Sequence, residues 1–206
     1  MREAISKELA EFCYEYFQTK RKVSQLFVER RYIPKTEVDI GWGFWADVQA
    51  PNTYCVYGDI VMETLLTKLQ PLMETEIKTK LYPTYSYARL YKNGDTLKRH
   101  TDRPSCKIST TLNLGGDPWP IFLEPSGEKG KKGKSILLES GDMLIYNGVN
   151  HEHWREAFKG ENCGQVFLHY RGDRKNEYDS RPFLGLPVPF AGPKQDYTVI
   201  KSISRR

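Results

Sequence analysis

The sequence predicts a mainly β fold with some α-helix, in which N-terminal helices buttress a double-sheet jelly roll (a double-stranded β-helix). Before about residue 80, apolar side chains recur at helical spacing. From about Tyr82 onward, the chain changes to short alternating runs that are broken by glycine and proline. About six such runs at this spacing are typical of a β-sandwich or barrel.

Two helices are predicted in the N-terminal part. The first covers Arg2–Thr19, where apolar residues follow a 3.6-residue spacing. The second begins after Asp59, its expected N-cap, and its apolar stripe continues to Ile77. Pro71 interrupts this stripe and is expected to kink or break the helix. Between the helices, Thr36–Val56 is rich in aromatic residues and is expected to contain a strand and a loop.

The β half contains the predicted strands, which are Tyr85–Tyr91, Cys106–Leu114, Pro120–Glu124, Ser135–Glu139, Gly141–Asn147 and Cys163–Arg171. The lysine-rich segment Gly127–Ser135 is expected to form a solvated hairpin tip. Because the chain has no internal repeat and no linker, we expect a single domain over residues 1–206. It would comprise helical support to about residue 80, a jelly-roll core over about 82–171, and an extended tail over 172–206 that packs on the sheet or closes an edge.

Composition excludes several classes of protein. With 39% hydrophobic and 28% charged residues, the 206-residue chain is neither disordered nor collagen-like. No apolar run reaches the roughly 20 residues of a membrane span, and the start MREAISK lacks the apolar stretch of a signal peptide. We therefore expect a soluble, intracellular protein of the cytoplasm. The net charge of +5 does not indicate nucleic acid as a partner. The four cysteines form no C-x-x-C pair and are expected to be reduced thiols.

Two short motifs in the β half carry the candidate chemistry. In Arg99–Asp102 (RHTD), His100 and Asp102 share one face of an extended segment, because side chains two residues apart point to the same side. One imidazole nitrogen and one carboxylate oxygen then have access to the same metal ion. The second motif, Asn150–Arg155 (NHEHWR), offers a further imidazole. Two histidines and one carboxylate that leave three positions open form the facial triad of non-haem iron(II) oxygenases.

The same region resembles a known family. The run YARLYKNGDTLKRHTD, followed by CKISTTLNL, resembles the Y-x-x-G-x-x-x-x-x-H-x-D pattern of 2-oxoglutarate- and iron(II)-dependent oxygenases of the prolyl-hydroxylase type. GDMLIYNGVNHEHWREAFKGENCGQVFLHY is similar to their distal-histidine region, in the form common among phage and marine-bacterial members. The resemblance covers about Tyr82–Arg171. It implies Fe(II), 2-oxoglutarate as cosubstrate, O₂ and, as an optional reductant, ascorbate, and it is compatible with a phage-encoded protein.

The resemblance implies His100, Asp102 and one of His151 or His153 as the iron ligands. We favour His153, since the similarity to the family includes H-W-R and not the preceding histidine. His151 is then expected at the surface or behind the ligands. Glu152 alternates with these histidines and is expected to point away from the metal.

The anchor for the far carboxylate of 2-oxoglutarate departs from the family pattern. The family usually places Lys or Arg nine or ten residues after the distal histidine, where this chain has Asn162 and Cys163. Arg155 is the expected substitute, because it shares the face of His153 and a guanidinium binds a carboxylate through two hydrogen bonds. The resemblance also assigns Tyr91 to the cosubstrate pocket.

Three further residues are candidates for this pocket, with a purely structural role as the alternative for each. Lys107 is expected to alternate with Thr111 on the strand after H-x-D, and Thr111 matches an inward polar position of the family. Gln165 on the last strand is a weaker candidate. His169 is expected to be a hydrogen-bonded structural histidine, and Arg103 is left without a role.

The resemblance implies a dioxygenase that hydroxylates an unactivated C–H bond. Peptidyl proline is the favoured substrate, so the expected partner is a peptide or protein. A nucleic-acid demethylase of the same superfamily ranks lower, because Arg171 lacks the second arginine of that family's motif. A cupin-like metal enzyme without 2-oxoglutarate and a non-catalytic jelly-roll binding module are the alternatives from other classes. The oligomeric state and a lid role for Gly127–Lys134 stay open.

Overall fold

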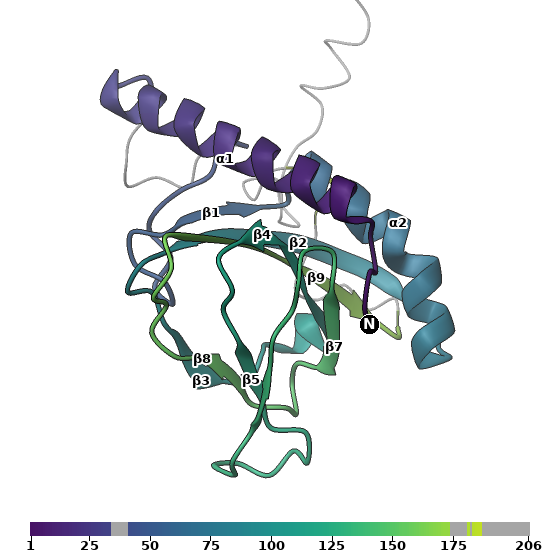
Figure 1. Cartoon of the computed structure of the whole chain (residues 1–206). Coiled ribbons are helices and arrows are strands. Elements are labelled where there is room, and N and C mark those ends of the chain that lie inside the picture. Colours follow the sequence, from purple (N-terminus) through teal and green to yellow (C-terminus); the bar gives the residue numbers. More distant parts are fainter. Residues whose placement is uncertain (34–40, 174–180, 182, 187–206) are drawn as a thin grey trace, which may run out of the picture.

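Two antiparallel β-sheets face each other, and two helices cover the outer face of the larger sheet (Figure 1). The structure, a computed structural model, describes residues 1–33, 41–173, 181 and 183–186. The larger sheet has the order β1-β2-β9-β4-β7. Its strands are β1 (Tyr54–Tyr57), β2 (Tyr82–Lys92), β9 (Asn162–Arg171), β4 (Ile108–Gly116) and β7 (Met143–Asn147). The smaller sheet, in the order β3-β8-β5-β6, contains β3 (Leu97–His100), β8 (His153–Arg155), β5 (Ile121–Leu123) and β6 (Lys134–Ile136). The predicted jelly-roll class is confirmed.

The first helix, α1, covers Lys7–Glu29, so the prediction of Arg2–Thr19 is wrong at both ends. Ser6 caps the helix by accepting a hydrogen bond from the Leu9 amide. The residues before Ser6 instead bond to the turn that precedes β7, where Arg2 pairs with Asp142. Beyond residue 19, straight-chain side chains that lose little entropy in a helix let it continue.

The second helix, α2, covers Ile60–Ile77 and begins at the predicted cap. The Asp59 carboxylate accepts hydrogen bonds from the amides of Val61 and Met62. The helix is continuous through Pro71, so the predicted break does not occur. Pro71 is exposed, while Met73 two residues later is fully buried. Packing of the apolar stripe on the larger sheet therefore holds the helix together on both sides of the proline.

Side chains of the larger sheet alternate between two environments. On β2, Ala88 and Leu90 belong to the core beneath the helices, whereas Tyr87 and Arg89 line a cavity on the other face. The strand β9 alternates in the same way, with Val166 and Leu168 in the core and Phe167 and His169 on the cavity. The helices thus cover an apolar face and leave the polar and aromatic face for the space between the sheets.

Each predicted strand overlaps a strand of the structure, and β5 and β6 form the expected hairpin with an exposed tip. Thr36–Val56 contains the start of β1, with residues 36–40 outside the described part. The predicted packing of the tail falls mostly on residues 174–180 and 187–206, which also lie outside it. All four cysteines are unpaired thiols, as predicted. Neither α1 nor α2, the helices of the described ranges, is long and apolar enough to span a membrane.

The short strands β3 and β8 were not predicted. They have four and three residues, which is too short for an alternating pattern to stand out. These two strands nevertheless carry the two histidines of the candidate site, and Asp102 lies in the loop directly after β3.

Candidate metal centre

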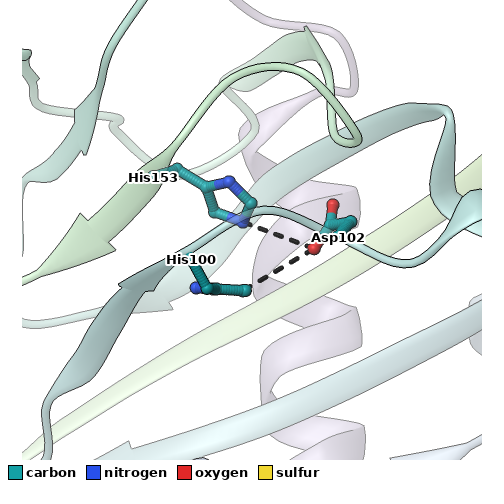
Figure 2. Close-up of side chains that lie close together, drawn as sticks. All are labelled: His100, Asp102 and His153. Atoms are coloured by element: carbon teal, nitrogen blue, oxygen red, sulfur yellow. Dashed lines mark ion pairs between the residues drawn. The ribbon is translucent and has the colours of Figure 1, made fainter. Parts of the chain in front are cut away.

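His100, Asp102 and His153 converge at the junction of β3 and β8 (Figure 2). His100 is the last residue of β3 and His153 the first of β8, and the two are paired in the sheet register. One carboxylate oxygen of Asp102 lies 3.6 Å from Nε2 of His100 and 3.5 Å from Nε2 of His153. One ligand atom from each residue fits within 4.8 Å of the others. The arrangement fits a divalent metal ion held by two imidazoles and a carboxylate.

Backbone contacts orient all three groups. Nδ1 of His100 lies 2.7 Å from the carbonyl of Lys98, and Nδ1 of His153 lies 3.1 Å from that of His151. A carbonyl oxygen only accepts, so each Nδ1 carries the hydrogen and each Nε2 presents its lone pair. The Asp102 amide donates to the carbonyl of Gly148 at 2.7 Å, which fixes the loop after β3.

The protonation states suit metal binding. Burial, and then the electrostatic interaction with His153, lower the pKa of His100, which favours the neutral imidazole. Burial by itself would raise the pKa of Asp102, but its interactions with His153 and His169 lower it below its ordinary value. The hydroxyl of Ser109 also donates to Asp102 Oδ2 at 2.9 Å. The site therefore presents a carboxylate and a neutral imidazole, which are the protonation states in which these groups bind metal ions.

The two histidines of the neighbouring motif NHEHWR lie in different places. His153 joins the converging group, and His151 does not. The Glu152 carboxylate accepts from the Arg99 guanidinium at 2.8 Å and from the Gly130 amide at 2.8 Å, so it faces away from the candidate metal position. His169 lies with Nδ1 3.0 Å from the Ser109 hydroxyl, behind Asp102.

A cavity of about 700 Å³ opens onto the three candidate ligands. Six aromatic residues form part of its wall, namely Phe44, Tyr57, Tyr85, Tyr87, Tyr146 and Phe167. A loop that sequence reasoning missed closes part of this wall. Asp47 in that loop accepts hydrogen bonds from Arg89 Nε at 2.9 Å and from the Tyr87 hydroxyl at 2.6 Å. The partners are about 40 residues apart in the chain, so no local pattern could reveal them.

Arg155 is buried to 2% exposure between the two sheets. Its Nη1 donates to the Trp119 carbonyl, whereas Nε and Nη2 have no hydrogen-bond partner among the described residues. Burial lowers the pKa of Arg155, and Cys163 and Tyr91 interact with it electrostatically. A buried guanidinium with free donors and no carboxylate partner fits an anionic ligand. The donor set and this arginine therefore fit a metal ion and a carboxylate-bearing cosubstrate, respectively.

The other predicted cosubstrate residues divide into two groups. Tyr91 is buried and accepts a hydrogen bond from Arg89 at 3.2 Å. Thr111 donates to Gln165 at 3.0 Å, and both are buried on adjacent strands. Lys107 is a different case, because it is exposed and lies in the turn before β4, with helical backbone angles. The expected alternation of Lys107 with Thr111 is wrong, since the strand begins only at residue 108.

No protein-family model matches this chain, and no curated protein matches it in sequence. Solved structures do match. A prolyl-4-hydroxylase from Pseudomonas putida aligns with a TM-score of 0.59 at 11% identity, over 84% of this chain and 91% of that one. HygX from Streptomyces hygroscopicus, solved with nickel and 2-oxoglutarate bound, aligns with 0.57 at 12% identity, over 84% and 82%. AviO1 from Streptomyces viridochromogenes Tue57 aligns with 0.59 at 11% identity, over 84% and 88%.

These similarities lie in the fold, since the identities are only 11–12%. The chain has the jelly-roll fold of the 2-oxoglutarate- and iron(II)-dependent oxygenases, as the sequence resemblance predicted. On that fold it carries a His-Asp-His group in which a metal ion fits.

Proposed function

We propose that the protein is a 2-oxoglutarate- and iron(II)-dependent dioxygenase with His100, Asp102 and His153 as the iron ligands. The observation that carries this proposal is the convergence of two imidazoles and one carboxylate at the wall of an aromatic cavity on this fold. Such a triad leaves open positions on one side of the metal for a cosubstrate and O₂. Iron(II), 2-oxoglutarate and O₂ together supply the oxidising chemistry, in which 2-oxoglutarate becomes succinate and CO₂.

We propose Arg155 as the anchor of the far carboxylate of 2-oxoglutarate. Its guanidinium interacts electrostatically with Cys163, which is one of the two positions, Asn162 and Cys163, where the family usually has its anchoring cation. This interaction supports a role for Arg155, from β8, that the family usually gives to a residue of the last strand. The electrostatic interaction with Tyr91 fits the same pocket, and the adjacent Thr111–Gln165 pair would form its polar wall. Lys107 has no part in this proposal, because it is exposed outside the sheet.

The chain's other residues orient and shield the site. The Ser109 hydroxyl fixes Asp102 through its hydrogen bond to Oδ2, so that Oδ1 faces the two histidines. The rings of Tyr146 and Phe167 line the cavity beside the ligands and limit the access of water. Excluding water in this way would protect a strongly oxidising site from side reactions.

For the substrate we propose a peptide or protein, hydroxylated at an unactivated C–H bond of proline. The fold similarity to the Pseudomonas putida prolyl-4-hydroxylase supports this choice. The aromatic wall also suits a proline ring, since apolar rings pack well on aromatic faces.

Activity on proline peptides tests the proposal. Succinate formation from 2-oxoglutarate, matched by a gain of one oxygen atom in the peptide, is expected only with Fe(II) present and is expected to disappear in Asp102→Ala. Tight metal binding that is indifferent to 2-oxoglutarate would favour the cupin-like alternative. No metal binding at all would leave the binding module. Succinate formation without peptide oxidation would reject proline as the substrate and retain the oxygenase.

A further inference from the structure

Arg103, which immediately follows the candidate ligand Asp102, lines the mouth of the cavity and is exposed to solvent. Its Nε donates a hydrogen bond to the Tyr85 hydroxyl at 3.1 Å. The centre of its guanidinium lies 4.8 Å from the centroid of the same ring. These two contacts hold the guanidinium in one orientation at the mouth and leave its Nη donors for another group.

Of the four charged side chains that line the cavity among the described residues, three have a charged or imidazole partner and Arg103 has none. Arg89 is paired with Asp47, and its Nη2 also donates to Gln49 at 2.7 Å. Asp102 is engaged by the two histidines and Ser109. Arg103 forms no ion pair with a carboxylate within the described ranges. A positioned guanidinium without a counterion, at the entrance to a candidate active site, is suited to an anionic group of the ligand.

An apolar surface adjoins this guanidinium. Tyr85 stacks on Tyr57 with ring centroids 4.7 Å apart and an interplanar angle of 14°. Tyr87 meets Tyr57 edge-on at 6.3 Å and Phe44 at 6.3 Å. All four rings line the cavity. The ligand that matches this surface has a compact apolar body with an anionic oxygen group beside it.

We infer that Arg103 recognises a carboxylate of the substrate, while the substrate's apolar part packs on the wall formed by Tyr57, Tyr85 and Tyr87. This inference rests on the proposed function, because it takes the cavity next to the metal as the substrate site. The subsite is distinct from that of Arg155, which is buried and does not line the cavity. A free acid and an acidic peptide residue share the required chemistry.

Binding of a small probe tests the inference. We would titrate 4-fluorophenylacetate and its neutral amide into the full chain by ¹⁹F NMR, with Ni(II) and saturating 2-oxoglutarate present so that their sites are filled. The acid is expected to bind about tenfold more tightly than the amide, as one charge-assisted hydrogen-bonded contact permits. Arg103→Gln is expected to abolish this preference, and Arg103→Lys to retain part of it. Lys107→Gln removes a nearby exposed cation outside the cavity and is expected to change nothing.

Two outcomes would overturn the inference: equal binding of acid and amide by the unmodified protein, or a preference for the acid that survives in Arg103→Gln. Failure of the proposed function has a different signature, namely no binding of Ni(II) or 2-oxoglutarate. In that case the same acid–amide comparison without either additive still reports on Arg103. To separate the two sources of carboxylate, N-acetylproline, which carries a terminal carboxylate, is compared with N-acetylprolylglutamate α-amide, whose only carboxylate is that of the side chain, and the tighter binder identifies the source. In Arg103→Gln, we expect the loss of both the preference for the acid over the amide and the preference between the two peptide-like acids.

Discussion

His153 and Arg155 lie two residues apart on β8, and both side chains are buried between the sheets, at 3% and 2% exposure. Trp154 between them points the other way and stacks on Phe122 at 5.4 Å. The alternation of one short strand therefore places a candidate metal ligand and a candidate carboxylate anchor side by side. A cosubstrate that binds the metal at one end and carries a carboxylate at the other end would fit between these two side chains.

Arg155→Met is expected to weaken 2-oxoglutarate binding by at least about tenfold, because the ligand loses charge-assisted hydrogen bonds from a buried guanidinium. Metal affinity is expected to stay unchanged, since Arg155 contacts none of the ligand atoms. Calorimetric titration of the metal and then of 2-oxoglutarate measures both quantities. Lys107→Met, which removes an exposed cation, is the matched control and is expected to behave as the unmodified protein.

The same substitution has an expected effect on stability. In the ligand-free protein, Nε and Nη2 of Arg155 lack partners within the described part of the chain, and an uncompensated buried charge is costly. The free energy of unfolding of ligand-free Arg155→Met is therefore expected to equal or exceed that of the unmodified protein. Urea denaturation measures it. A clear loss of stability would mean that Arg155 serves the fold and not a ligand.

Ser109→Ala is expected to lower metal affinity by about tenfold, because Asp102 loses the hydrogen bond that orients it. Thr110→Ala is the matched control, since Thr110 lies next in the strand and its hydroxyl accepts from the Leu168 amide instead. Competition of each variant against a metal-sensitive dye gives the affinities. Equal affinities for the two variants would show that the Ser109 contact does not position the ligand.

Cys106 is expected to be the most readily alkylated thiol at neutral pH. Burial would raise its pKa, but the charge and hydrogen bond of His169 lower it to about 7. Its alkylation rate by iodoacetamide should rise with pH and level off above about 7, because the thiolate is the reactive form. Burial raises the pKa of Cys13 to about 11 and of Cys55 to about 12, so these thiols serve as internal references. Mass spectrometry of the alkylated peptides over pH 5–9 measures these rates. An alkylation rate of Cys106 that keeps rising up to the ordinary thiol pKa of 9.0 would contradict the prediction.

Pro71→Ala is expected to stabilise the protein by about 1–3 kcal/mol, because α2 is continuous through Pro71 and a proline inside a helix removes a backbone hydrogen bond. The greater entropy of the unfolded chain without proline offsets about 0.4–1 kcal/mol of this gain. Since Pro71 is exposed, no packing is lost. Urea unfolding monitored by circular dichroism measures the change, and a lower midpoint would contradict the explanation.

The sequence was most informative where one strand or one helix carries the pattern. The Asp59 cap correctly located the start of α2, and His100 and Asp102 of RHTD lie close together even though β3 ends at His100. Local spacing was less reliable at element boundaries. The backbone turn at Lys107 shifts the start of β4 and removes that side chain from the sheet.

Contacts between distant segments could not be predicted. The loop that carries Asp47 reaches Arg89 only through the tertiary fold, and no short-range pattern marks such a pair. The proximity of Arg155 to Cys163 likewise depends on how the two sheets face each other. The burial of Arg155, whose Nε and Nη2 have no partner among the described residues, becomes visible only once both sheets are in place.

The central claim is that His100, Asp102 and His153 hold a metal on which 2-oxoglutarate binds. Anaerobic calorimetric titration of 2-oxoglutarate into Fe(II)-loaded protein tests it most directly. We predict one equivalent of 2-oxoglutarate bound only when Fe(II) is present, with binding lost in His153→Ala and Asp102→Ala and retained in His151→Ala. Binding of 2-oxoglutarate that needs no metal, or that survives in Asp102→Ala, would contradict the account.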